Sequence, residues 1–435
     1  MTARGQDGGP GRGPGEQRRA GAQRPQAPRG TYDVLPDQAV VRARLEAAAR
    51  DILEPAGYGR IETPAFEATE LFARGVGEST DIVQKEMYTF EDAGGRSLTL
   101  RPEGTAPVCR AYLEHGMHTL AQPVKLWYLS SYFRQEKPQA GRFRQFWQLG
   151  AEAIGSDDPA VDAELIVLLH TLLGELDVQG LRLRLGSLGS LEARAEYRDR
   201  LTAYLHANAE RLSADVRDRI DLNPLRAFDA KDPGTQAVMD EAPLLLDSLS
   251  AEDREHFDEV CARLRVAGID WDLDGTLVRG IDYYTRTIFE FTSDALGAQS
   301  GVAGGGRYDG LIELLGGPPT PGMGWAAGIE RMLLSAGERP APTPMADLFV
   351  AHEDRGVEAF ALTAEARAAG LAVQQELAGR SLKGQLKQAD RAGARYVAIL
   401  GADGIRLRDM ESGEQESVES AAAAVARVIK GRHLR

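Results

Sequence analysis

Residues 125–154 read KLWYLSSYFRQEKPQAGRFRQFWQLGAEAI, and this stretch decides the fold. Two runs rich in aromatic residues and leucine flank a polar loop at residues 137–142, which Pro138 and Gly141 interrupt. Such runs around a loop with proline and glycine predict a β-hairpin whose loop is longer than a tight turn.

The second arm of this hairpin alternates, because successive strand residues point to opposite faces. Trp147, Leu149, Ala151 and Ala153 share one face, and Phe146, Gln148, Gly150 and Glu152 share the other. The first face is predicted to be core. The second face combines an amide with a carboxylate, and such groups are costly to bury unless something binds there.

Arginine and glutamate gather around the hairpin loop. Arg134 and Glu136 share a face of the first arm, and the loop adds Arg142 and Arg144. Arginines above a sheet face suit a phosphorylated ligand, because the guanidinium fork pairs with phosphate oxygens. A salt-bridged hairpin without a ligand is the alternative, since structural ion pairs are common.

Composition limits the class of protein. The 435 residues allow two or three domains, and no apolar run is long enough for a transmembrane helix. Cys109 and Cys261 follow no metal-ligand spacing, so we expect neither a disulfide nor a zinc site, and a reducing cytoplasm fits. The net charge of −14 argues against nucleic-acid binding by bulk charge, so that ligand would need a local basic patch.

The N-terminal segment is predicted to be a disordered tail. Residues 1–28 are rich in glycine, proline and arginine and lack Val, Ile, Leu, Phe, Tyr and Trp, so they cannot bury a core. Order is predicted from about Arg29, with helical spacing over residues 40–53 and a strand within residues 57–67.

Three further segments carry candidate functional residues. A strand enters a helix after Pro102-Glu103-Gly104-Thr105, where Thr105 is predicted to cap a helix whose first N–H groups point towards a bound ligand. A simple capping turn is the alternative. Residues 277–291, LVRGIDYYTRTIFEF, place Arg279, Tyr283 and Tyr284 before a β-rich run. Residues 301–311, GVAGGGRYDGL, and 322–334, GMGWAAGIERMLL, are glycine-rich, and the second carries Arg331 on a predicted helix.

The remaining sequence predicts two more regions. Residues 193–262 are charged and largely helical, which indicates an inserted helical domain. After a linker at residues 338–344, strands alternate with helices and predict an α/β unit with a mostly parallel sheet. Cations recur there at three- and four-residue steps, and this stripe is either a solvated helix face or a phosphate-binding patch: Arg380, Lys383, Lys387, Arg391 and Arg395.

These motifs together resemble one family. FRQEKPQAGRFRQFWQLGAE, residues 133–152, resembles motif 2 of the class II aminoacyl-tRNA synthetases in the version found in histidyl-tRNA synthetases. The helix and strand after Arg29 resemble motif 1, residues 103–105 resemble the amino-acid-binding signature, and residues 322–334 resemble motif 3. Residues 277–291 and 301–311 resemble two motifs specific to histidyl-tRNA synthetases.

The resemblance implies an architecture and partners. It implies an α+β catalytic domain at residues 29–340 with an antiparallel sheet flanked by helices, containing the helical insertion at residues 193–262. Residues 345–435 resemble the anticodon-binding domain of class IIa enzymes. Motif 1 implies a homodimer, and no membrane association is expected.

The resemblance also implies an activity, that of a histidine–tRNA ligase in the cytoplasm. Histidine and ATP with Mg²⁺ would form histidyl-adenylate, and the histidyl group would pass to the 3′ end of tRNA(His). No metal ligand from a protein side chain is expected. A non-catalytic paralogue, the regulatory subunit of ATP phosphoribosyltransferase, is an alternative, as is a plain tRNA-binding or structural dimer.

The resemblance assigns expected roles residue by residue. Arg134 and Arg279 would be catalytic and would bracket the α-phosphate, with Glu136, Arg142 and Arg331 also on ATP. The histidine pocket would comprise Glu103, Gly104, Thr105, Arg134, Gln148, Glu152, Arg279, Tyr283 and Tyr284. Gln139 and the basic stripe would contact tRNA. Which glutamate serves the amino group and which serves the imidazole stays open.

Two residues depart from the family pattern. Lys137 stands where the family commonly has arginine, and a lysine lacks the guanidinium fork for a bidentate contact to nucleotide or tRNA. Trp147 stands where histidine is frequent, and because it lies on the predicted core face it is expected to affect packing.

Overall fold

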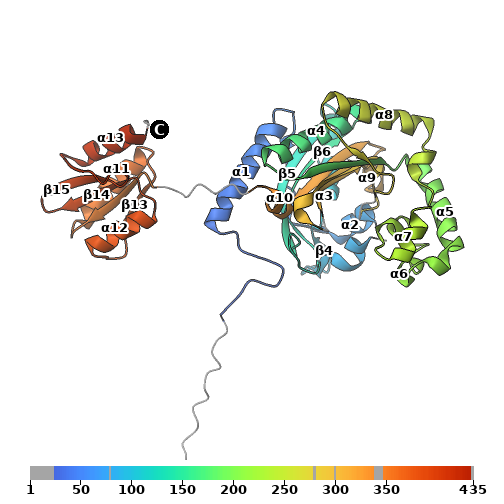
Figure 1. Cartoon of the computed structure of the whole chain (residues 1–435), viewed down its shortest axis with the longest axis horizontal. Helices are drawn as coiled ribbons and strands as arrows, with labels where there is room; N and C mark the ends of the chain where they lie inside the picture. The colour runs from blue at the N-terminus through green and yellow to red at the C-terminus, as the bar shows by residue number, and fades with distance from the viewer. Residues whose placement is uncertain (1–23, 78–79, 278–280, 298–299, 338–345, 433–435) are drawn as a thin grey trace, which may run out of the picture. The chain divides into compact units, whose positions relative to one another are not determined.

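The computed structural model describes residues 24–77, 80–277, 281–297, 300–337 and 346–432. The chain divides into two compact units (Figure 1). The first comprises Leu45–Gly337 with the described residues before Val34, and the second comprises Val34–Arg44 with the described residues after Gly337. The first 23 residues of the predicted tail and Arg279 lie outside the described residues.

An eight-stranded sheet forms the centre of the first unit, in the order β1-β5-β6-β11-β10-β9-β7-β8. Its strands are β1 Gly59–Arg60, β5 Val124–Phe133, β6 Gln145–Ile154, β7 Leu181–Ser187, β8 Asp272–Leu273, β9 Thr285–Ser293, β10 Gly301–Arg307 and β11 Gly322–Gly328. Neighbours are antiparallel except for the two-residue strands β1 and β8, which pair in parallel at the edges. The predicted antiparallel sheet is therefore confirmed.

The predicted hairpin is confirmed as β5 and β6. Its register runs from Val124 opposite Ile154 to Phe133 opposite Gln145. The first arm ends at Phe133, so Arg134 and Glu136 begin the loop and do not lie on the strand as predicted.

The two faces of the sheet carry separate apolar clusters. Leu149, Ala151 and Ala153 of β6 are fully buried on one face, as their alternation predicts. That face packs against the C-terminal half of α1 Pro36–Leu53, α4 Pro159–Glu175 and α8 Ala251–Val266, and α4 and α8 contact each other (Figure 1). The opposite face packs against α3 Thr105–Glu114 and α9 Leu311–Leu314 and holds the polar residues of β6.

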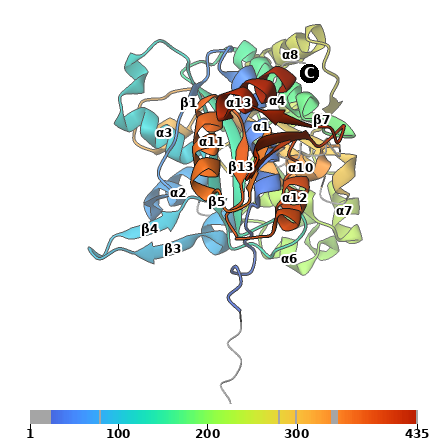
Figure 2. The same ribbon diagram turned by 90° about the vertical axis from the view of Figure 1, so that its left-hand side faces the viewer.

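A small sheet lies apart from the main one. It has the order β2-β4-β3, with β2 Phe66–Ala68, β3 Tyr88–Glu91 and β4 Ser97–Leu100, and β3 and β4 lie side by side (Figure 2). The prediction of one strand over residues 57–67 is wrong, because β1 and β2 belong to different sheets. Around this sheet lie α2 Thr69–Val76 and the π-helical turn η1 Ile82–Glu86.

One group of helices lies between β7 and α8, and the remaining helices are distributed along the first unit. The first group, here called the helical region, comprises α5 Leu191–Ala207, η3 Ala209–Arg211, α6 Ala214–Arg217, η4 Pro224–Asp229, α7 Pro233–Met239 and η5 Leu245–Ser248. Elsewhere lie η2 Met117–Thr119, η6 Asp294–Leu296 and α10 Ile329–Ser335. Across the described residues, no helix combines the length and apolarity that crossing a bilayer requires.

The second unit is a five-stranded sheet in the order β13-β12-β14-β15-β16. Its elements are β12 Leu348–His352, α11 Gly356–Ala368, β13 Val373–Gln375, α12 Leu382–Arg391, β14 Tyr396–Gly401, β15 Gly404–Asp409, β16 Gln415–Val418 and α13 Ala421–Arg432. Helices α11 and α13 cover one face and α12 covers the other (Figure 1). The prediction of a mostly parallel sheet is wrong, because β15 and β16 pair antiparallel.

Candidate active site

A cavity of about 170 Å³ lies on the polar face of β6. It brings together seven residues singled out from the sequence: Glu103, Gly104, Thr105, Arg134, Gln148, Tyr283 and Tyr284. The other lining residues are Ile82, Ile281, Gly304, Tyr308, Gly324, Trp325 and Ala326. Segments that are distant in the sequence therefore converge on one chamber.

Glu152 lies behind the cavity wall and is not itself a lining residue. Its carboxylate is fully buried and accepts hydrogen bonds from Thr105 Oγ1 at 2.8 Å, Tyr308 OH at 2.8 Å and Tyr128 OH at 3.2 Å. Burial raises the pKa of Glu152 to about 8, although these hydroxyl groups lower it. Glu152 thus fixes two lining side chains, Thr105 and Tyr308.

Glu103 caps the helix that begins beside the cavity. Its carboxylate accepts hydrogen bonds from the backbone N–H groups of Thr105 at 2.7 Å and Ala106 at 2.9 Å. The predicted capping by Thr105 is wrong, because its hydroxyl turns to Glu152 and Gly104 is the N-cap. Burial raises the pKa of Glu103, while the two backbone N–H groups lower it.

Glycines around the cavity make room for the protein's own side chains. A Cβ on Gly104 or Gly150 would lie within 2.5 Å of the Tyr128 side chain, and one on Gly324 would lie 1.7 Å from Glu152 Oε2. Such distances are far below van der Waals contact. These glycines are required for the buried cluster of Glu152 and Tyr128.

The hairpin loop places cations next to the cavity. Arg134 lines the cavity, donates from Nε to the carbonyl oxygen of Pro102 at 2.9 Å, and lies over the Phe146 ring. Glu136 is 3.7 Å from Arg134 and 3.5 Å from Arg142. The loop is therefore salt-bridged, as the structural alternative expects, and it also presents a guanidinium group at the cavity.

One sequence comparison decides the family. The family model described as histidyl-tRNA synthetase matches residues 30–332 of this chain. The chain belongs to the histidyl-tRNA synthetase family. Its mixed α+β catalytic unit, a large sheet flanked by helices, is the class II synthetase fold that the sequence predicts.

Similar proteins cover nearly the whole chain. A histidine–tRNA ligase of Desulforamulus reducens is 47% identical over 90% of this chain and 96% of its own. One from Thermosynechococcus vestitus is 48% identical over 90% of this chain and 93% of its own. The crystal structure of apo histidyl-tRNA synthetase from S. aureus superposes with a TM-score of 0.77 at 34% identity, covering 93% of this chain and 99% of that one.

The cavity lining does not include four other residues singled out from the sequence: Arg331, Arg142, Gln139 and Trp147. Arg331, on α10, donates from Nε to the carbonyl oxygen of Gly301. Arg142 and Gln139 are exposed in the hairpin loop, where their backbones pair at 2.9 and 3.2 Å. Trp147 is half-buried and packs against the main core cluster, which confirms its predicted place on the core face, and its backbone N–H donates to Glu330 at 3.1 Å.

The basic stripe of the second unit is shorter than predicted. Helix α12 spans Leu382–Arg391, so Arg380 precedes it and Arg395 follows it. Acids also contact both outer residues: Glu376 lies 3.3 Å from Arg380, and Glu411 lies 2.7 Å from Arg395. The prediction of five cations along one helix is wrong, and the exposed cations on the helix are Lys383, Lys387 and Arg391.

Sequence reasoning missed several residues that line this cavity or lie behind its wall. Tyr308 lies in the quoted glycine-rich segment, but no local pattern shows that its hydroxyl reaches Glu152. Tyr128 could have been found, because it pairs with Gly150 in the hairpin register and so shares the face of Glu152. Ile82 and Ile281 are apolar wall residues that only the tertiary fold brings to the cavity.

Proposed function

We infer that this chain is a histidine–tRNA ligase. It activates histidine with ATP to give histidyl-adenylate and pyrophosphate, and it transfers the histidyl group to the 3′ end of tRNA(His). The observation that carries this function is the joint lining of one cavity by Glu103, Arg134, Gln148 and Tyr283, which come from three separate motifs. The regulatory-subunit alternative is not favoured, because relatives 47–48% identical over 90% of the chain are histidine–tRNA ligases.

The cavity residues are proposed to bind histidine. Gln148 Oε1 is buried and has no hydrogen-bond partner among the described residues, so it is available to a ligand donor. Glu103 and Thr105 supply polar groups at the start of α3, while Glu152 orients Thr105 and Tyr308. Gly104, Tyr283 and Tyr284 complete the wall. A site that pairs both ring nitrogens rejects isosteres that lack them.

The arginines are proposed to bind ATP. Arg134 and Arg279 hold the α-phosphate, where negative charge builds during adenylyl transfer, and Arg142 and Arg331 hold the outer phosphates. The histidine carboxylate attacks phosphorus, so no protein side chain is the nucleophile. Catalysis then consists of positioning and charge stabilisation.

Mg²⁺ is proposed to accompany ATP. Its protein ligands are usually one or two carboxylates, with substrate phosphates completing the octahedron. Glu86 and Glu136 are the carboxylates near Arg134 and Arg142 that would hold the ion. Burial and the neighbouring Glu136 raise the pKa of Glu86, while the two arginines lower it. When bound, the ion neutralises phosphate charge. No cluster of three or more potential metal ligands occurs within the described segments.

Further partners and the division into domains are part of the proposal. Residues 29–340 are the catalytic domain, residues 193–262 an insertion near the tRNA acceptor arm, and residues 345–435 the anticodon-binding domain. Gln139, Arg380, Lys383, Lys387, Arg391 and Arg395 are proposed tRNA contacts. The enzyme acts as a cytoplasmic homodimer.

Exchange of labelled pyrophosphate into ATP tests the proposed function. The purified chain should exchange label only when histidine is present, since the adenylate must form and reverse. Arg279→Ala should lower exchange strongly while leaving the thermal unfolding midpoint unchanged. Exchange that does not depend on histidine, or none with the wild-type chain, would refute the ligase.

A further inference from the structure

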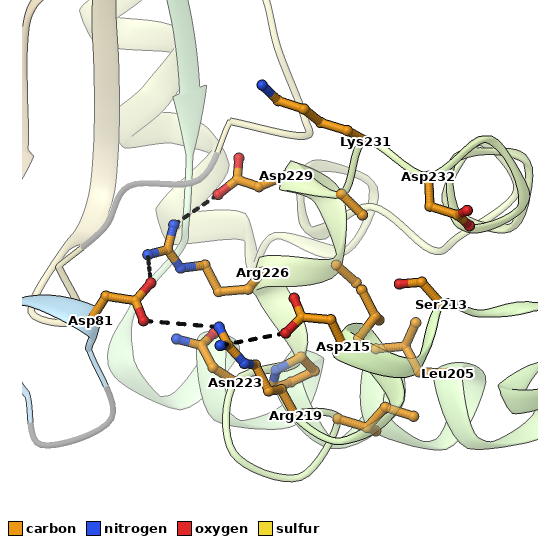
Figure 3. Close-up of a pocket in the computed structure, with 15 residues that line it drawn as sticks. Asp81, Leu205, Ser213, Asp215, Arg219, Asn223, Arg226, Asp229, Lys231 and Asp232 are labelled. Atoms are coloured by element: carbon orange, nitrogen blue, oxygen red, sulfur yellow. Dashed lines mark hydrogen bonds and ion pairs between the residues drawn. The ribbon is translucent and has the colours of Figure 1, made fainter. Parts of the chain in front are cut away.

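A second hollow, of about 220 Å³, adjoins a bridge of ion pairs between the helical region and the segment that leads to the histidine cavity (Figure 3). Asp81 points from that segment towards two arginines of the helical region. Its carboxylate is 3.2 Å from Arg226 and 3.9 Å from Arg219. Asp229 holds Arg226 at 3.0 Å, and Asp215 holds Arg219 at 3.5 Å, so each arginine is oriented by two acids.

Asp81 is joined directly to the cavity wall. The next residue, Ile82, opens the π-helical turn, is 5% exposed and lines the histidine cavity. A shift of the Asp81 backbone therefore moves a wall residue. The two arginines fix the position of that backbone from outside the cavity.

The helical region also contacts a second segment of the cavity wall, residues 281–284. Asn223, between the two arginines in sequence, donates from Nδ2 to Asp282 Oδ1 at 3.4 Å. Arg194 of α5 donates to the carbonyl oxygens of Asp282 and, at 2.9 Å, of Tyr284. Asp282 lies between Ile281 and Tyr283, which both line the cavity.

The two anchored segments meet inside the catalytic unit. Ile82 belongs to a small apolar cluster with Phe72 and Val76, and Ile281 packs against that cluster. The backbone N–H of Asp282 donates to the carbonyl oxygen of Val76 at 3.2 Å. Movement of one segment is therefore felt by the other.

We propose that residues 219–226 clamp two walls of the histidine cavity, and that Arg219 and Arg226 are positioning residues for histidine activation. This inference rests on the proposed function. The side chains of Asp81, Arg219 and Arg226 are 41%, 38% and 31% exposed, so their pairing contributes little to global stability. Breaking this pairing should reduce the fraction of molecules in which the cavity wall holds its binding position. A smaller fraction lowers the apparent affinity for histidine.

Pyrophosphate exchange without tRNA tests this clamp. The double variant Arg219→Ala/Arg226→Ala should raise the KM for histidine by about three- to tenfold, the range expected for losing partly exposed ion pairs that bias a wall. The KM for ATP and the unfolding midpoint should stay near wild type. Arg217→Ala is the matched control, since this exposed arginine lies on α6 beside the same stretch.

Asp81→Asn removes the carboxylate charge that pairs with both arginines. It tests the same ion pairs if the double arginine variant does not fold. It should raise the KM for histidine to a similar extent, and adding it to the arginine variant should cause little further change. An unchanged KM for histidine in Asp81→Asn, or equal effects of both variants on histidine and ATP, would overturn the clamp. Loss of histidine-dependent exchange in the wild-type chain would instead overturn the ligase function.

Discussion

Replacing Glu152 with glutamine tests whether the buried carboxyl group is neutral in the folded chain. Glutamine has nearly the same shape and cannot ionise, so it reproduces the protonated form. The site is suited to this comparison, because Glu152 is fully buried and burial raises its pKa from an ordinary value of 4.5 to about 8. We therefore expect Glu152→Gln to fold normally.

The expected magnitude follows from proton linkage. Between pH 4.5 and pH 8 the folded chain keeps a proton that the unfolded chain has released, so the free energy of unfolding falls as pH rises. For one group the fall is about 1.4 kcal/mol per pH unit within this window. Since the variant lacks this proton, the wild type should lose roughly 3 kcal/mol relative to Glu152→Gln between pH 5 and pH 7.

Urea unfolding followed by tryptophan fluorescence measures this difference. All four tryptophans lie in the unit that contains Glu152, so their emission reports on its unfolding: Trp127, Trp147, Trp271 and Trp325. Midpoints are compared at pH 5, 6 and 7, with Glu54→Gln at an exposed position as the control. Wild-type and variant curves that run parallel with pH would refute the reasoning.

The same variant also bears on activity. Glutamine keeps one acceptor oxygen and replaces the other with an NH₂ group, so one of the three hydroxyl groups that donate to Glu152 must change partner. A hydrogen bond between neutral groups is worth about 0.5–1.5 kcal/mol, so kcat/KM for histidine should fall by about two- to tenfold in pyrophosphate exchange. Unaltered kcat/KM would exclude Glu152 from orienting Thr105 and Tyr308 for the substrate.

Three further changes address the glycines, the arginine fork and the basic helix. Gly324→Ala should destabilise the first unit by about 1–3 kcal/mol and reduce histidine activation, because its Cβ would overlap the Glu152 carboxylate, whereas Gly174→Ala, with nothing within 4 Å, should be tolerated. Arg134→Lys should lower exchange and raise the KM for ATP, since a point charge replaces the bidentate fork; wild-type kinetics would contradict this. The exposed cations of α12 are Lys383, Lys387 and Arg391. Replacing them by alanine should weaken tRNA binding and reduce the slope of log K against log salt concentration by about one unit per cation, while pyrophosphate exchange stays unchanged. A salt slope equal to that of the wild type would exclude these cations from phosphate contact.

Period-two patterning made the hairpin predictable. The alternation from Phe146 to Ala153 assigns each side chain of β6 to a face, and the packing of Leu149, Ala151 and Ala153 in one apolar cluster follows it. The same alternation places Gln148 and Glu152 on the other face, where the cavity lies. Patterning was sufficient here because the side chains of a strand can point only two ways.

Local patterns were less informative where a tertiary contact decides the outcome. Thr105 has the chemistry of a helix cap, but Glu103 reaches the same backbone N–H groups and leaves the threonine hydroxyl to Glu152. The basic stripe was extended too far, because Gly393, with φ +59°, follows the end of α12. Its acidic partners Asp409 and Glu411 come from a later strand and turn, which periodicity along a helix cannot reveal.

Desolvated polar groups, more than cavity size, account for selectivity in the proposed histidine site. Burial raises the pKa of both Glu103 and Glu152, so ionising either group inside the protein is costly, and Gln148 Oε1 has no partner within the described residues. An apolar amino acid of similar volume would leave such an acceptor unpaired at a cost of about 1–3 kcal/mol. A ligand that brings an ammonium group and an imidazole N–H relieves that cost, so the cavity discriminates through groups that the fold alone leaves unsatisfied.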